Sequence, residues 1–149
     1  MNRRSQFVVV AAALAAIVLP LSLGKSAAQP PADAPACNLN GTWTFTAPSA
    51  AGPVAGQPGR LVVRGATATV SFGEPATASV TMRARIADGV LQITDTRSNP
   101  PSLRCTEREA GQYRLNYANA CGEVNLELLY EPCAGRRGAL AGTTLTRQP

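Results

Sequence analysis

The feature that most constrains the fold of this chain is a recurring two-residue alternation of apolar and polar side chains. It is clearest over 80–86, where apolar residues alternate with a threonine and with Arg83 and Arg85. Successive side chains of a β-strand point to opposite faces, so this spacing predicts a strand with one apolar face. Asp88-Gly89 follows, and Asp-Gly between two alternating segments is a strong signal for a β-hairpin. No stretch has the spacing of an amphipathic helix.

Segments of the same kind recur along the chain at intervals typical of an all-β domain. The segment 98–102, with its paired prolines, interrupts the pattern because proline cannot donate to a ladder of strands. We expect a turn over 135–138. The expected strands are 42–46, 60–64, 67–72, 80–86, 90–94, 113–117, 124–130 and 140–147.

One face of these strands is apolar, and an antiparallel sheet with one solvated face must bury the other. Curling into a closed barrel buries that face and also removes the exposed sheet edges. The sequence therefore predicts an all-β fold, a single small antiparallel up-and-down barrel of about seven or eight strands. The residues expected to face inward are Trp43, Phe45, Leu61, Val63, Val70, Phe72, Val80, Met82, Ile86, Leu91, Ile93, Tyr113, Leu115, Tyr117, Val124, Leu126, Leu128 and Tyr130.

Residues 1–28 have the composition of a cleaved signal peptide. Two arginines precede an apolar run over 7–23, and small residues at 26–28 suit a cleavage site. The alternative is a membrane anchor, but the run has 17 residues, near the lower limit for a spanning helix, and Pro20 and Gly24 interrupt the pattern.

A proline- and alanine-rich segment, 29–36, follows and is expected to form a flexible leader ahead of a barrel domain over 37–149. We therefore expect a secreted or periplasmic protein that has no stable membrane insertion after cleavage. Residues 29–149 contain eleven arginines, no lysine and nine acidic residues, a net charge of +2. This balance, with no long basic run, gives no indication of nucleic-acid binding.

All four cysteines lie after the expected cleavage site, and an even number in an exported chain favours two disulfides. If the last hairpin is centred on Asn119, Cys105 lies opposite Cys133 at its open end and Cys121 lies at its tip. The final strand returns to that tip, where the first strand begins with Cys37. We therefore predict the disulfides Cys37–Cys121 and Cys105–Cys133, each stabilising the fold by about 2–4 kcal/mol.

The residue types present exclude several chemistries. The chain has no histidine, so a Ser-His-Asp or Cys-His mechanism is impossible, and no CxxC spacing favours a metal site. With both disulfides formed, only carboxylates remain for acid–base work. Asp95 is the one carboxylate in phase with the inward set, but we expect it to be a solvated residue at the rim of the barrel. We expect no cofactor, and we favour a protein without enzymatic activity over an enzyme.

The segment Asn40-Gly41-Thr42-Trp43 resembles the Gly-x-Trp that opens the first strand of lipocalin-like (calycin) barrels. The resemblance implies that Trp43 closes one end of the barrel and that an arginine near the end of the last strand, here Arg147, packs across its ring. First and last strands of a closed meander pair antiparallel, which independently brings the two residues together. The segments 111–114 and 131–137 are similar to small secreted lipocalin-like domains of bacteria.

The same N-terminal segment, with Cys37, also resembles the start of avidins. The likeness ends there because avidin-type sites need further tryptophans, and Trp43 is the only one in the chain. We expect no biotin binding.

Two functional hypotheses remain. The first is a binding module that holds a small hydrophobic ligand in the barrel mouth, with candidate residues Phe45, Phe72, Met82, Tyr113 and Tyr117. Small barrels can instead be filled by their own side chains. The second is a protein-interaction domain, such as a secreted protease inhibitor that acts through an N-terminal arm at 29–36. Inhibitors of this kind resemble the chain in their Gly-x-Trp start but not in their disulfide spacing.

Two arginine pairs complete the set of candidates. Arg83 and Arg85 point outward together and either meet an acidic partner or form a solubilising face, and we favour the second interpretation. Arg136 and Arg137 lie in the expected turn after Cys133 and either bind an anion or are solvated. Here too we favour solvated charges.

Overall fold

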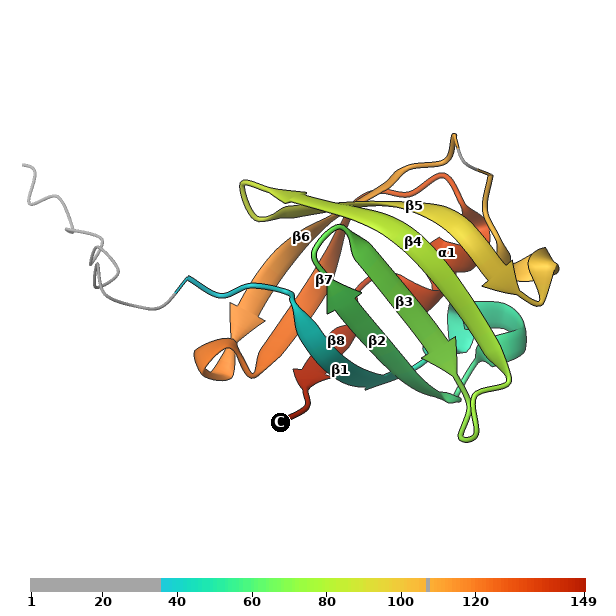
Figure 1. Ribbon diagram of the computed structural model, residues 1–149, viewed down its shortest axis with the longest axis horizontal. Coiled ribbons are helices and arrows are strands. Elements are labelled where there is room, and N and C mark those ends of the chain that lie inside the picture. The colour runs from blue at the N-terminus through green and yellow to red at the C-terminus, as the bar shows by residue number, and fades with distance from the viewer. Residues whose placement is uncertain (1–35, 107) are drawn as a thin grey trace, which may run out of the picture. The chain divides into compact units, whose positions relative to one another are not determined.

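The computed structural model describes residues 36–106 and 108–149, and these form a closed antiparallel barrel of eight strands (Figure 1). Each strand pairs with the next along the chain, and β1 pairs with β8. The predicted all-β up-and-down barrel is confirmed. The strands are β1 (Gly41–Thr46), β2 (Pro58–Arg64), β3 (Thr67–Phe72), β4 (Ala78–Ala87), β5 (Val90–Asn99), β6 (Gly111–Ala118), β7 (Glu123–Tyr130) and β8 (Thr144–Arg147).

The expected signal peptide at 1–28 and the flexible leader at 29–36 fall outside the described residues, apart from Ala36, and both stay predictions. Within 36–106 and 108–149, no helix has the length and hydrophobicity needed to cross a membrane.

Four helical segments connect the strands: η1 (Ser49–Val54), η2 (Pro101–Leu103), η3 (Asn119–Cys121) and α1 (Ala134–Leu140). The prediction of a turn over 135–138 and a strand from Leu140 was wrong, because α1 occupies this segment and β8 begins only at Thr144. Arg136, Ala139 and Leu140 are buried. They follow an i, i+3, i+4 spacing, so they lie on one face of the helix.

Three residues expected to face inward are exposed: Ile86, Leu128 and Tyr130, with exposed fractions of 44%, 40% and 59%. β8 pairs with β7 only at positions 123–125. The later part of β7 therefore has no strand paired with it on the β8 side. A β-bulge between Gln112 and Tyr113 also shifts the register of this hairpin. The β6–β7 pairing, which includes Ala118 with Glu123, is centred slightly after the expected Asn119.

Trp43 and Arg147 close one end of the barrel. They are directly paired across β1 and β8, the indole is fully buried, and the Arg147 guanidinium carbon lies 4.4 Å from the centre of the Trp43 ring. The indole Nε1–H donates to the carbonyl oxygen of Leu39 at 2.8 Å. Gly41 has φ +129°, and a Cβ at this position would lie 3.3 Å from Arg147 Nη1. Glycine is therefore needed both for the backbone conformation and for the close approach of the guanidinium.

Arg147 also joins two separate backbone segments, one before β1 and one at the β6–β7 turn. Its Nη2, Nη1 and Nε donate to the carbonyl oxygens of Asn38 (2.6 Å), Asn40 (3.1 Å) and Cys121 (3.3 Å). The disulfide Cys37–Cys121 lies beside these contacts, and Cys105–Cys133 is the second disulfide. These are the two pairs expected from the sequence, although the register on which that expectation was based is shifted.

Replacing Arg147 by Ala is expected to lower the free energy of unfolding by about 2–3 kcal/mol, because the stacking on indole and the hydrogen bonds are lost together. Lys at this position keeps the charge without the planar fork and should recover less than half of the loss. Urea unfolding followed by Trp43 fluorescence measures both variants. Arg85→Ala is the matched control, and it should change stability by less than about 0.5 kcal/mol. Equal effects of the two alanine variants would contradict the role of Arg147.

Candidate functional site

A cavity of about 580 Å³ lies at the other end of the barrel, where β1 ends and β2 begins. Elements η1 and α1 border it, and they pack closely, since a Cβ on Gly138 would collide with the carbonyl oxygen of Ala50. Figure 1 shows α1 near this end and the β6–β7 hairpin at the other. The cavity is lined mainly by apolar residues: Ala50, Ala51, Gly52, Pro53, Val54, Val70, Phe72, Val80, Met82, Leu103, Ala134, Ala139 and Leu140.

A buried ionic cluster supplies the main polar groups of the cavity wall. Arg136 of α1 forms ion pairs with Asp95 of β5 (Nη1 to Oδ1, 2.7 Å) and with Glu131 (Nε to Oε2, 2.6 Å). Its Nη2 donates to Glu131 Oε1 at 2.8 Å and to the carbonyl oxygen of Glu109. Asp95 and Arg136 line the cavity, and Glu131 lies behind them.

Both carboxylates of this cluster receive further hydrogen bonds. The backbone N–H of Cys105 donates to Asp95 Oδ2 at 2.8 Å, and that of Cys133 donates to Glu131 Oε1 at 2.9 Å. The disulfide Cys105–Cys133 therefore joins the two backbone segments that donate hydrogen bonds to the two carboxylates. The cluster is a fixed unit, because each buried charge has an opposite charge and several donors or acceptors.

Tyr113 completes the cluster by donating its phenolic O–H to Glu131 Oε2 at 2.6 Å. Burial, with the hydrogen bond to the Glu131 carboxylate, raises the pKa of Tyr113 far above its usual value. Burial by itself lowers the pKa of Arg136, but the hydrogen bonds to Glu131 and Asp95 outweigh this effect and raise it overall. Tyr113 therefore stays a neutral donor and Arg136 a permanent cation.

Among the five candidate ligand residues, only Phe72 and Met82 line this cavity. Phe45 packs edge-on against Phe72, with ring centres 6.0 Å apart. Tyr113 lies in the ionic cluster instead. Tyr117 is half-buried and pairs with Val124 near the β6–β7 turn, away from the cavity lining.

The expectations for Asp95 and Arg136 were wrong. Both were expected to be solvated, yet their exposed fractions are 1% and 6%. Strand alternation puts Asp95 on the inner face opposite Met82, in the same register as Ile93 opposite Ala84, and α1 directs Arg136 onto it. Glu131 was not singled out at all. The inward phase of Asp95 was a sequence signal for this cluster, and segment 131–137, which contains both Glu131 and Arg136, was a second.

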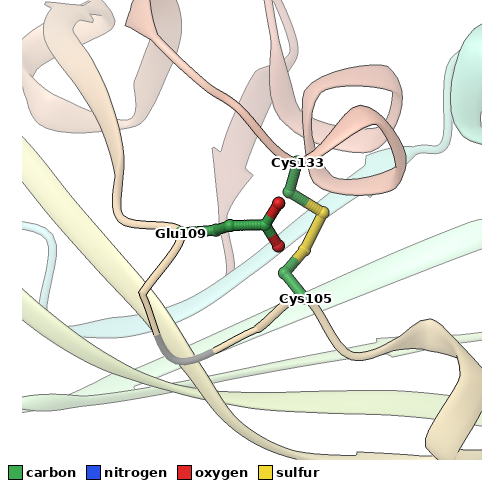
Figure 2. Close-up of side chains that lie close together, drawn as sticks. All are labelled: Cys105, Glu109 and Cys133. Carbon is green, nitrogen blue, oxygen red and sulfur yellow. A yellow bond between two sulfur atoms is a disulfide. The ribbon is translucent and has the colours of Figure 1, made fainter.

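Cys105, Glu109 and Cys133 bring their sulfur and oxygen atoms within 4.8 Å of one another, a geometry that resembles a metal site. Figure 2 shows that the two sulfurs are bonded to each other, with the Glu109 carboxylate directed toward them. The disulfide leaves no thiolate to bind a metal ion. The Glu109 carboxylate instead accepts the backbone N–H of Thr106 at 2.8 Å.

Comparison of the chain with protein-family models, with curated proteins and with solved structures gives no match. The eight-stranded closed barrel is consistent with a calycin-like fold.

Arg136→Met is expected to lower the free energy of unfolding by about 3–5 kcal/mol, because it leaves two buried carboxylates without a cation. Arg137→Met, at the exposed neighbouring position, is the control and should cost less than about 0.5 kcal/mol. Replacing the whole cluster (Asp95→Asn, Glu131→Gln, Arg136→Met) should recover part of the loss. Denaturant unfolding measures all three, and similar small losses for Arg136→Met and Arg137→Met would contradict the buried cluster.

The raised pKa of Tyr113 predicts a loss of stability in alkali. Above its ordinary pKa of 10.0, Tyr113 ionises in the unfolded chain but keeps its proton in the folded protein. The unfolded state then binds fewer protons, so the free energy of unfolding falls as the pH rises beyond this value. Tyr113→Phe should flatten this decline, whereas Tyr130→Phe, at an exposed position, should not. Unfolding curves between about pH 8 and pH 11 give the free energy of unfolding as a function of pH. Identical slopes of this free energy against pH in the two variants would contradict the role of Tyr113.

Proposed function

We propose that this protein is an exported, lipocalin-like binding module that holds a small, largely apolar molecule in the cavity between η1, α1 and the inner faces of β3 and β4. The single observation that carries the proposal is the cavity of about 580 Å³ with a mainly apolar lining. Ligand pockets usually have volumes of about 300–1,000 Å³ and combine an apolar lining with few polar groups.

The distribution of polar groups supports an apolar ligand with one polar end. Phe72, Val80 and Met82 form an apolar wall from two strands. Asp95 and Arg136 form an ion pair at one place, and Ser102 and Arg104 are the other polar side chains of the lining. Four of the five guanidinium N–H groups of Arg136 have acceptors among the described residues. One N–H on Nη1 is left to donate to an oxygen of the ligand. Burial of the apolar part would supply most of the affinity.

The cluster supports binding rather than proton transfer. Both oxygens of Asp95 accept hydrogen bonds, one of them from a permanent cation. Asp95 is therefore engaged with groups of the protein on both oxygens, which favours a role in fixing Arg136 over a role as a general base. Export is supported by the two disulfides, which persist in oxidising compartments, and by the signal-peptide pattern of the first 28 residues.

A polarity-sensitive dye, anilinonaphthalene sulfonate, and a series of medium-chain fatty acids and alcohols test this proposal. We expect saturable enhancement of dye fluorescence and displacement by the aliphatic compounds. Dye fluorescence is the suitable signal because Trp43 lies at the closed end and does not line the cavity.

Two variants locate the binding site. Val80→Phe and Ala134→Phe narrow the cavity at a half-buried and an exposed position, and each should weaken binding at least about tenfold. Ala87→Phe, exposed at the β4–β5 turn and outside the lining, should leave affinity unchanged. Absence of saturable binding by the native protein, or an equal effect of all three substitutions, would overturn the proposal.

A further inference from the structure

The outer surface of β2 to β5 carries a concentration of arginines that the cavity does not explain. The side chains at outward positions of β2, β4 and β5 include five arginines, and all five are exposed. We call this surface the arginine face. Its arginines are Arg60, Arg64, Arg83, Arg85 and Arg97.

Strand register shows how these arginines are spaced on the face. Arg64 pairs with Thr67, which pairs with Arg83, so the two arginines are two strands apart in one row, about 10 Å between backbones. In the next row, Thr81 lies beside Arg97. Arg83 and Arg85 are two residues apart on the same strand, so both side chains are on its outer face and their backbone positions are about 7 Å apart. The spacing allows several guanidinium groups to contact one extended partner.

The positive charge of this face is not neutralised within the described part of the chain. The ion pairs there are those of Arg136, and none of the five arginines has a side-chain hydrogen bond to another described residue. The outward positions of β1 to β5 include no carboxylate, since Asp95 points inward. Glu74 and Asp88 lie in the connecting turns.

The outward carboxylates of the strands are on another part of the barrel. Glu123 and Glu127 belong to β7, where Glu127 pairs with Arg114 of β6. Although the net charge over residues 29–149 is only +2, the charges are separated around the barrel: the arginine face is positive and the outward carboxylates are on β7. This distribution creates a local positive potential that favours an anionic partner.

The other outward side chains of β3 to β5 are mostly short and hydroxyl-bearing. Thr69 and Thr81 approach each other to 3.5 Å between hydroxyl oxygens at the centre of the face. Val62 is half-buried, and no aromatic side chain lies among the outward positions of β2 to β5. The face offers guanidinium and hydroxyl groups, but its outward positions have no large, exposed apolar side chain for insertion into a membrane and no ring on which a base can stack.

We propose that the arginine face binds an acidic polysaccharide through its carboxylate or sulfate groups. Guanidinium groups bind such planar or tetrahedral oxyanions through paired hydrogen bonds, and the threonine and serine hydroxyls between them suit the hydroxyls of sugars. The convex surface of a barrel gives access to a flexible chain that lies across several strands. This site is separate from the cavity and does not depend on the proposed ligand.

Binding of the purified native protein to immobilised heparin and polygalacturonate tests the proposal, with neutral dextran as the reference. We expect saturable binding to at least one acidic polymer, no binding to dextran, and a steep loss of affinity as salt is raised. Arg64→Gln combined with Arg83→Gln should weaken binding at least about tenfold, because two adjacent contacts are removed. These side chains are exposed, so unfolding curves should match those of the native protein.

Arg114→Gln is the matched control, since Arg114 is also an exposed strand arginine but pairs with Glu127 outside the arginine face. It should change affinity by less than twofold. The cavity variant Val80→Phe should bind the polymer as the native protein does. Failure to bind either acidic polymer at low salt would overturn the proposal, as would an equal loss in Arg114→Gln. Tighter binding to duplex DNA or to phosphatidylglycerol vesicles than to both polymers would also overturn it.

Discussion

The barrel closes through a short seam in which β1 pairs with β8 at Trp43–Arg147 and Thr44–Thr146, and the side chain of Arg147 strengthens this seam. Its guanidinium stacks on the buried indole and donates to three carbonyl oxygens. One of these oxygens belongs to Cys121, which is disulfide-bonded to Cys37. Without this closure β1 and β8 would be exposed sheet edges, prone to pair with other chains. The inner surface that forms the cavity exists only because the sheet is closed.

The two ends of the barrel are stabilised by different physical means. Trp43 fills one end, so no space is left there for a ligand. At the other end, Arg136 pairs with both Asp95 and Glu131 beside a disulfide, and α1 is held against η1. A buried ionic cluster contributes little net stability compared with apolar packing, but it fixes positions because each group needs its partners. It can therefore keep the cavity wall in one arrangement.

Strand alternation gives the protein two separate surfaces from one set of residues. Along β4, Met82 and Ala84 are buried whereas Arg83 and Arg85 are exposed. The inner residues define the apolar wall, and the outer residues define the arginine face. Because neighbouring side chains point in opposite directions, a substitution on one surface leaves the other largely unchanged.

The sequence alone determined the strands, their approximate bounds, the contact between Trp43 and Arg147, and the pairing of the cysteines. The strands follow from two-residue periodicity and turn signals, which are local. The distant pairs follow from the antiparallel order of a closed meander, which brings the first and last strands together. Only the tertiary structure decided the burial of Arg136 with Asp95, since these residues are 41 positions apart and meet because the short helix α1 carries Arg136 to the inner face of β5. The cavity was likewise beyond the sequence, because the space between side chains depends on how all the elements pack together.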